Sequence, residues 1–249
     1  MNLPIPSRIL NRVARSFAIS LKILPRQVRP PITLAYLLAR ISDIEADGPS
    51  HKEDLILLSI KSHLLKHLQA SPDRDLIEAV WSTIRQGQQF DRTRFPSPLP
   101  LSPAELDQYT FLVAGCVGIF WTQLCSRHIQ KFSNLQLPHL EKLGASYGKA
   151  LQLVNILRDR HRDENAGRIY LTAPQIPKAI ISARQGLNDG ILYSLSIRIR
   201  RLRAATILPA LIADKTLNLI EKNPNHPMPK IPKSQVYILT LQALLTSTR

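Results

Sequence analysis

Apolar residues recur at helical spacing along almost the whole sequence, and no stretch alternates as a half-buried strand would. Only 9 of the 249 residues are glycine, which disfavours Gly-rich nucleotide-binding loops and folds with many tight β-turns. The pattern predicts helices over residues 8–24, 32–46, 52–69, 73–90, 103–130, 137–164, 175–186, 189–221 and 234–247. Ser102, Pro103 and Glu105 form a capping signal at the start of the fifth helix. Without a repeat or a break in composition, we expect one all-α domain over residues 1–249.

The charge balance is strongly basic. The chain has 33 Lys and Arg residues against 18 Asp and Glu residues, a net charge of +15. This balance suits an anionic partner, whether nucleic acid, a phosphorylated substrate or an anionic membrane surface. The densest basic stretch, "SIRIRRLR" at 196–203, has no interleaved aromatic residues, so no nucleic acid is expected. We expect a phosphorylated substrate and a peripheral contact with anionic membrane; the alternative for the membrane is that the charge serves solubility and the phosphate pocket alone.

The spacing of the two cysteines and the length of the longest apolar run bear on where in the cell the protein is found. Cys116 and Cys125 lie nine residues apart on one predicted helix, about 13 Å along its axis, which is too far for a disulfide. Unpaired cysteines favour a reducing compartment. The longest apolar run, residues 111–121, is too short to span a bilayer. We therefore expect a cytoplasmic protein whose membrane contact, if present, is peripheral and on the inner face.

Two pairs of aspartates stand at the ends of two predicted helices that are otherwise largely apolar. Asp43 and Asp47 end the segment "AYLLARISDIEAD", and Asp159 and Asp163 repeat the same spacing. Residues four apart share one helix face, with Cβ atoms about 6 Å apart. Two such pairs facing each other would need cations between them, and Mg²⁺ prefers carboxylates together with substrate phosphates. The pairs thus predict a metal clamp for a diphosphate; the plain alternative is that each pair is a solvated helix end.

The ordered segments "RSFAISLKILP", "AYLLARISDIEAD", "YTFLVAGCVG" and "ALQLVNILRDRHRDENAGRIYL" resemble the motifs of the squalene/phytoene synthase family. The resemblance runs from about residue 12 to residue 245. It implies an all-α isoprenoid-synthase bundle with a central cavity for prenyl diphosphates. It also implies Mg²⁺-assisted diphosphate release and head-to-head condensation of two prenyl diphosphates through a cyclopropyl intermediate.

The resemblance assigns roles to individual residues. The metal ligands would be Asp43, Asp47, Asn155, Asp159 and Asp163. The substrate-binding residues would be Ser16, Phe17, Arg40, Gln152, Asn155, Arg158, Arg168 and Tyr170, with the arginines on phosphate oxygens. Tyr109 would lie near the reacting carbons, where a phenol stabilises a cation or relays a proton. Its alternative is a helix tyrosine with its hydroxyl in water.

The second aspartate motif departs from the family pattern, because Arg162 stands where a glutamate is usual. The leading reading is synthesis of squalene from two farnesyl diphosphates, and the alternatives are phytoene or dehydrosqualene synthesis and a non-catalytic role. Squalene synthesis from farnesyl diphosphate would add NADPH as reductant, whereas phytoene or dehydrosqualene synthesis needs no reduction and uses the same residues. A non-catalytic relative acting as an assembly factor is favoured by Arg162 and opposed by the four aspartates. The motifs do not choose between C15 and C20 substrates.

Overall fold

The computed structural model describes residues 7–14, 17–95, 97, 99–223, 226 and 229–246. Within these residues the α-helices are α1 Ser7–Ala14, α2 Phe17–Ile23, α3 Arg29–Asp47, α4 Lys52–Ser59, α5 Lys61–Gln69, α6 Arg74–Arg94, α7 Pro103–Thr110, α8 Cys116–His128, α9 Leu137–Asn165, α10 Ile176–Ser196, α11 Arg200–Lys222 and α12 Lys233–Thr246. A π-helical turn, η1 Phe111–Gly115, joins α7 to α8, and a short 3₁₀ turn, η2 Ala173–Gln175, precedes α10. The all-α prediction is confirmed.

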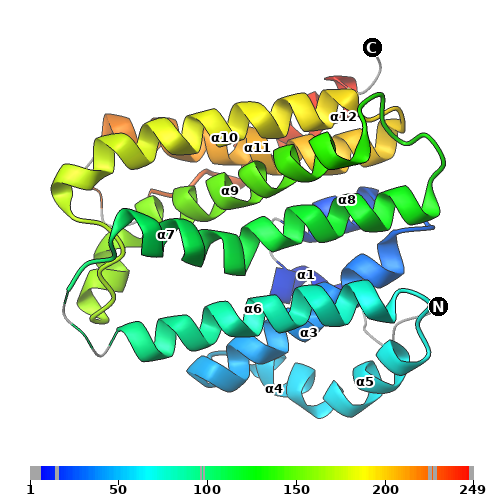
Figure 1. Cartoon of the computed structure of the whole chain (residues 1–249), viewed down its shortest axis with the longest axis horizontal. Coiled ribbons are helices and arrows are strands. Elements are labelled where there is room, and N and C mark those ends of the chain that lie inside the picture. Colours follow the sequence, from blue (N-terminus) through cyan, green and yellow to red (C-terminus); the bar gives the residue numbers. More distant parts are fainter. Residues whose placement is uncertain are drawn as a thin grey trace.

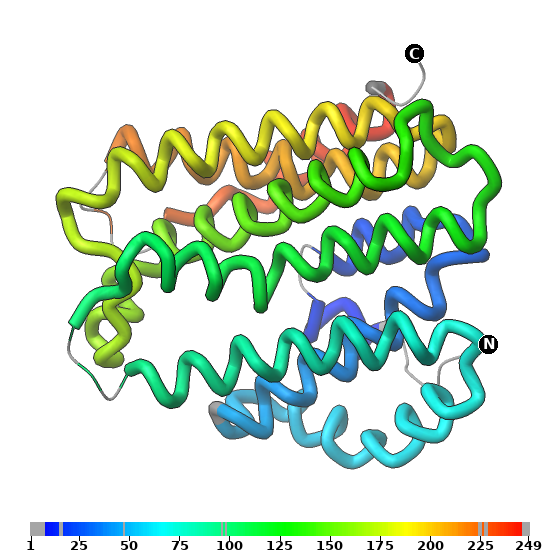
Figure 2. Tube along the Cα trace, viewed as in Figure 1, coloured from blue at the N-terminus to red at the C-terminus, as the bar shows by residue number. Residues whose placement is uncertain are grey.

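The helices stack in layers (Figure 1). In that view α6 lies with α3, α4 and α5 on one side, the rod formed by α7, η1 and α8 crosses the middle, and α9 to α12 lie on the other side. The α3 helix packs on α6, α8 packs on α9, and α9 packs on α10. Figure 2 traces α9, α10 and α11 as an antiparallel stack, followed by α12 against α11.

Two buried clusters of apolar side chains divide the interior. One gathers residues of α2, α3, α5, α6 and α8, including Leu38, Ile77 and Leu124. The other gathers residues of α9, α10 and α11, including Leu157 and Leu217. Tyr109, Tyr147 and Tyr170 belong to the second cluster, so three polar phenols enter an otherwise apolar core. The two clusters flank the space that holds the candidate site.

The close approach of α8 to α9 depends on glycine. A Cβ atom at Gly118 would lie 1.9 Å from the carbonyl oxygen of Gly144, far inside van der Waals contact. Gly148 meets the backbone of Ala114 in a similar way, with 2.2 Å to its carbonyl oxygen. The absence of side chains at these positions lets the two backbones touch. It therefore fixes how the middle rod lies against α9.

The predicted break at residues 187–188 is wrong, because α10 continues to Ser196 and the chain bends at 197–199 instead. Gly186 and Gly190, on either side of this position, face α9. A Cβ at Gly190 would lie 2.3 Å from the ring of Tyr147. These glycines serve close packing within a helix rather than a turn. The helix predicted over 52–69 also divides, into α4 and α5 at Ile60.

The rod from Pro103 to His128 begins as the sequence predicts and passes through the core. Ser102 accepts a hydrogen bond from the Glu105 amide, and the Glu105 side chain accepts one from the Ser102 amide, which completes a capping box. By length and composition this 26-residue helix is long and apolar enough to cross a membrane. It packs between α6 and α9, and the core helix of a protein can have the same length and apolar composition as a membrane-spanning helix. Cys116 and Cys125 are both buried and free, as the spacing predicted.

Candidate active site

A cleft of about 680 Å³ opens between α3, α6, α8 and α9. Its polar lining includes Asp43, Gln88, Asp91, Tyr109, Gln152 and Arg168. Its apolar lining includes Phe17, Val80, Val117, Phe120 and Trp121. An adjoining hollow of about 190 Å³ shares Phe17, Val117 and Trp121 and extends to the glycines between α8 and α9. The combined space suits a molecule with an apolar chain and a charged head.

Asp43 reaches the cleft from the last turn of α3. Leu38, Ile41 and Ile44 on the same helix are buried and fix the face that the helix turns to the core. The Asp43 side chain is 45% exposed, and its Oδ1 atom accepts a hydrogen bond of 2.5 Å from Gln88 Nε2. Asp47 lies one turn later on α3. The side chain of Asp47 and all of Ser16 lie outside the described residues.

Arg40, predicted to bind phosphate, pairs with two carboxylates in the structure. Its Nη2 atom lies 3.0 Å from Oδ1 of the buried Asp54, and its Nη1 atom lies 4.0 Å from Asp43 Oδ2. Burial raises the pKa of the Asp54 carboxyl, but hydrogen bonds from the Ser50 amide and the charge of Arg40 outweigh this, so the pKa lies below its ordinary value. Arg40 therefore ties α3 to the start of α4.

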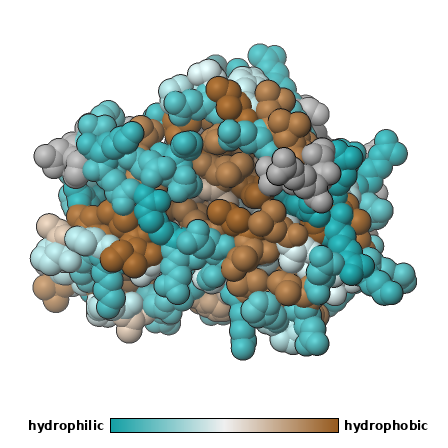
Figure 3. Space-filling view, turned by 90° about the horizontal axis from the view of Figure 1, so that it is seen from above, coloured by the Kyte–Doolittle hydropathy of each residue, from teal (hydrophilic) through white to brown (hydrophobic). Residues whose placement is uncertain are grey.

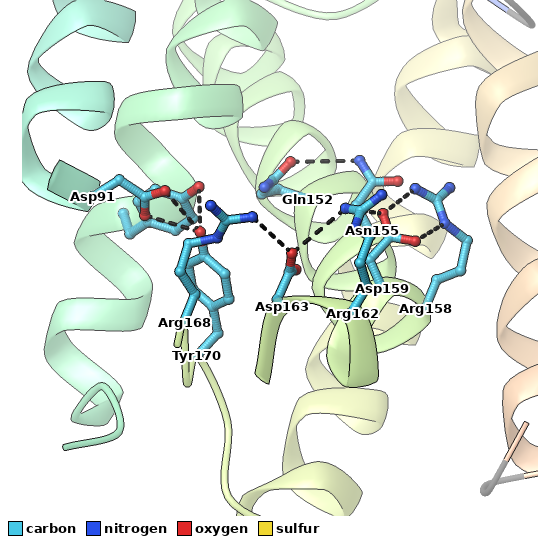
Figure 4. A network of polar contacts seen from close by, with 10 residues as sticks. Asp91, Gln152, Asn155, Arg158, Asp159, Arg162, Asp163, Arg168 and Tyr170 are labelled. Carbon is cyan, nitrogen blue, oxygen red and sulfur yellow. Dashed lines mark hydrogen bonds and ion pairs between the residues drawn. The ribbon is translucent and has the colours of Figure 1, made fainter. Parts of the chain in front are cut away.

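The second aspartate motif, Asp159 and Asp163, forms a network with neighbouring guanidinium groups (Figure 4). Asp159 and Asp163 are 8% and 7% exposed on the inner face of α9. Arg158 donates two hydrogen bonds to Asp159, of 2.8 and 2.7 Å. Arg168 donates one of 3.2 Å to Asp163. Arg162 Nη2 lies between the two carboxylates, 3.1 Å from Asp159 Oδ2 and 3.5 Å from Asp163 Oδ1.

The charge of Asp159 is held in place by its neighbours. Burial raises the pKa of its carboxyl, but the hydrogen bonds and charge of Arg158, with the charge of Arg162, lower it further than burial raises it. The pKa therefore lies below its ordinary value of 3.8, and Asp159 is ionised at neutral pH.

The predicted metal clamp of four aspartates lies only partly within the described residues, because the Asp47 side chain is outside them. Within the described ranges, no three His, Cys, Asp or Glu side chains converge as ligands for one ion. Both carboxylates of the second motif already bind guanidinium groups, and Asn155 donates to Gln152 at 3.4 Å. A magnesium ion at Asp159 and Asp163 would have to displace those arginines. The second motif does not fit Mg²⁺ in this arrangement.

A hydrogen-bonded chain of two phenols and a carboxylate lines the other side of the cleft. Tyr170 donates to Asp91, 2.9 Å from each carboxylate oxygen. Because this uses the single Tyr170 proton, Tyr109 must donate in the contact of 3.3 Å between the two hydroxyls. The Tyr109 and Tyr170 rings stack with centroids 5.1 Å apart. The plain alternative of a water-exposed Tyr109 is wrong, since this residue is 7% exposed.

Burial governs the acidity of these phenols. It raises the pKa of Tyr109 and of Tyr170, and the negative charge of Asp91 raises both further. Burial lowers the pKa of Arg168, but hydrogen bonding to Asp163 and nearby charges raise it overall. At neutral pH both phenols keep their protons and Arg168 keeps its charge. Tyr109 is therefore suited to stabilising a cation or passing on a proton, and it is a poor base.

Two polar residues of the cleft, Gln88 and Asp91, were missed from the sequence. They lie three residues apart on α6, a polar helix that resembles a solvated surface helix. Their i, i+3 spacing, which places both on one face, was the available signal. Their partners, Asp43 and Tyr170, are 45 and 79 residues away, so the pairing depends on the tertiary fold.

The fold and the cleft define an isoprenoid-synthase type of helical bundle, and comparisons with known proteins identify its branch. The family model for squalene/phytoene synthase matches residues 10–176. The chain belongs to the squalene/phytoene synthase family. Members of this family are prenyltransferases that condense prenyl diphosphates head to head and use a divalent metal to bind diphosphate.

The relatives agree with this family. A squalene synthase of Cyberlindnera jadinii is 26% identical over 195 residues, which cover 65% of this chain and 44% of that protein. This chain thus spans less than half the length of that relative. The structure of TcSQS in complex with the ligand E5700 has a TM-score of 0.78 at 21% identity, covering 97% of this chain and 88% of the other. A dehydrosqualene synthase in complex with a ligand has a TM-score of 0.71 at 19% identity, covering 95% and 93%.

Proposed function

We propose that this chain condenses two prenyl diphosphates head to head, with farnesyl diphosphate as the substrate. The observation that carries this proposal is the cleft of about 680 Å³, which has apolar walls and a polar end. Its walls suit an isoprenoid chain, and Asp43, Tyr109 and Arg168 mark the polar end. Family membership supplies the reaction class.

In this proposal the diphosphate is bound by arginines and by a divalent ion at the first aspartate motif, Asp43 and Asp47. Arg168 lines the cleft, and Arg158 lines a smaller hollow of about 180 Å³ beside Phe17 and Asn155. Their guanidinium groups match phosphate oxygens in charge and shape. The first motif is the place for a divalent ion, because Mg²⁺ typically binds one or two carboxylates together with substrate phosphates. Asp43, with Asp47 on the same helix, supplies that set.

The reaction begins when the C–O bond to diphosphate breaks and the electron pair leaves with the diphosphate. The double bond of the second prenyl chain attacks the allylic cation that remains, and loss of a proton to the released diphosphate closes a cyclopropyl diphosphate. Positive groups around the leaving diphosphate lower the barrier by stabilising charge that develops in the transition state. Tyr109, oriented by Tyr170 and Asp91, lines the cleft, and we assign it to stabilise the allylic cation.

Product analysis tests the proposal. Purified protein is incubated with farnesyl diphosphate and Mg²⁺, with and without NADPH, and the extracted products are identified by mass spectrometry. We expect squalene with NADPH, and dehydrosqualene or a rearranged alcohol without it. Dehydrosqualene under both conditions, or phytoene from geranylgeranyl diphosphate, would assign the chain to the branch without reduction. No product from a folded protein with either substrate would favour the non-catalytic assembly factor, which the arginine-filled second motif supports.

An anionic membrane surface is the partner we assign to the face formed by α11 and α12. The α12 helix packs on α11 through Leu239 and Ala243 and leaves a stripe of five exposed apolar residues, namely Tyr237, Ile238, Leu241, Leu244 and Leu245. Figure 3, the view from above onto the layer that contains α10, α11 and α12, shows apolar side chains gathered between hydrophilic ones. Arg200 and Arg201 are exposed within two turns of Ile207 and Leu208, which α12 contacts.

An apolar stripe beside basic residues is typical of helices that lie in a membrane interface. The partner follows from charge complementarity, because a chain of net charge +15 is attracted to anionic lipid. A hydrocarbon product also needs a route into lipid. We propose a cytoplasmic protein that binds the inner membrane face peripherally.

A further inference from the structure

We infer that Arg162 acts as a built-in cation that bridges the two carboxylates of the second motif and closes this pair to a divalent ion. The inference rests on the proposed function, since it concerns how the same site receives a diphosphate. It assigns any divalent ion to the first motif alone and leaves guanidinium groups to bind phosphate at the second.

The geometry places one nitrogen between two carboxylates. Arg162 Nη2 lies 3.1 Å from Asp159 Oδ2 and 3.5 Å from Asp163 Oδ1. Figure 4 shows this guanidinium between the two aspartates, with Arg158 and Arg168 on their outer sides. A magnesium ion would need oxygens from both carboxylates at about 2.1 Å from one point. In this chain that point is taken by the guanidinium nitrogen.

The local charge favours the same conclusion. Three guanidinium groups, from Arg158, Arg162 and Arg168, face the two carboxylates, which leaves one positive charge in excess. An added cation meets repulsion there, whereas an anion is attracted. Both carboxylates are buried, so this interaction is screened less than at the surface.

Arg162 also remains available to a ligand. Its side chain is 54% exposed, while Asp159 and Asp163 are buried beneath it. A guanidinium carries five N–H donors in a fixed fork, and the two contacts to the aspartates use one of its nitrogens. The remaining donors can bind a phosphate oxygen while the bridge is kept. Arg162 therefore supplies positive charge between the two aspartates and still has donors for an anion.

Arg160 provides a matched control. It lies on the same turn of α9 and carries the same charge, but its guanidinium faces His161 and Glu164 instead of the paired aspartates. Arg160→Gln and Arg162→Gln remove one positive charge each. A difference in metal binding between them reports the position of the guanidinium rather than the total charge of the protein.

Manganese titration followed by electron paramagnetic resonance tests the inference, with inorganic pyrophosphate present as the anion probe. Relative to the wild-type protein, we expect the Asp43→Asn variant to bind Mn²⁺ more weakly and the Asp159→Asn variant to bind it equally well. We expect Arg162→Gln to bind additional Mn²⁺ at least about tenfold more tightly than Arg160→Gln, because a nearby like charge has been removed. Asp159→Asn in the Arg162→Gln background should abolish this gain.

Two results would overturn the inference. One is a loss of Mn²⁺ binding in Asp159→Asn as large as in Asp43→Asn. The other is equal Mn²⁺ binding by Arg162→Gln and Arg160→Gln, which decides the matter even if Asp159→Asn fails to fold. Neither measurement depends on turnover. The proposed function fails separately, in the product analysis, if no condensed hydrocarbon is formed.

Discussion

Tyr170 and Asp91 are joined across the cleft by a hydrogen bond of 2.9 Å to each carboxylate oxygen. This contact links the loop after α9 to α6, and it orients the Tyr170 hydroxyl that accepts a hydrogen bond from Tyr109. The position of the Tyr109 phenol in the cleft thus depends on a carboxylate that does not touch it.

Replacing Asp91 by alanine is expected to lower kcat about tenfold, because Tyr109 loses the orientation that the chain of hydroxyls provides. Asp91→Asn retains an acceptor for Tyr170 and should recover part of the activity. Steady-state kinetics with farnesyl diphosphate checks this. Asp107→Asn, which removes a surface partner of Lys149 on α9, is the control. A changed KM with an unchanged kcat would assign Asp91 to binding and contradict its positioning role.

The pairing of Arg158 with Asp159 predicts a pH-dependent stability. The pKa of Asp159 is lowered in the folded protein, so its contribution is present above the ordinary pKa of 3.8 and is lost as pH falls through the folded value. We expect Arg158→Met to reduce the free energy of unfolding by about 2 kcal/mol at pH 7, and by less below pH 3.8.

Urea unfolding between pH 7 and pH 3 measures this difference. Arg92→Met, which removes an exposed arginine that binds Gln89, should cost little at any pH. A deficit of Arg158→Met that is equally large at pH 7 and pH 3 would show that ion pairing with Asp159 is not its source.

The close contact between α8 and α9 predicts that a side chain added at Gly118 destabilises the protein. Gly118→Ala would place a Cβ atom 1.9 Å from the Gly144 carbonyl oxygen, so the helices must move apart. We expect a loss of about 1–3 kcal/mol in the free energy of unfolding, the usual range for overpacking. Ser126→Ala, at an exposed position of α8, is the control. Equal stability of the two variants in chemical denaturation would refute the close backbone contact.

The exposed stripe of α12 predicts a membrane contact that has an apolar part and an electrostatic part. Leu241→Glu should reduce sedimentation with anionic vesicles several-fold, because it puts a charge into the stripe. The control is Leu55→Glu, at an exposed leucine of α4. Wild-type binding should weaken at high salt. Equal loss in both variants, or equal binding of the wild type to neutral and anionic vesicles, would contradict the assignment of this face.

Periodicity predicted where most helices lie but not how they end. The apolar spacing of α3 and α9 located both helices to within a few residues, since a buried face repeats with the turn of the helix. The break predicted at 187–188 is absent from α10, where Gly186 and Gly190 admit side chains of α9. In sequence, a glycine that admits a neighbouring side chain looks the same as one that ends a helix. Only the position of Tyr147 distinguishes these cases.

The candidate site was predicted in part for a similar reason. Tyr109, Gln152 and Arg168 were assigned to the site from the sequence, and all three line the cleft. Asp91 was missed because its partner is 79 residues away. The metal clamp was predicted from the spacing of four aspartates, but spacing does not show that Arg158, Arg162 and Arg168 bind two of them.

Release of pyrophosphate from farnesyl diphosphate shows whether Asp43 and a divalent ion assist the loss of diphosphate. It is measured with Mg²⁺ for the wild type and for Asp43→Asn, and again with a chelator. We expect release by the wild type and loss of release with the chelator. We expect a rate for Asp43→Asn that is lower by about a hundredfold, because a group that stabilises charge in the transition state has been removed. Release by Asp43→Asn at the wild-type rate, or no release by folded wild-type protein, would contradict this expectation.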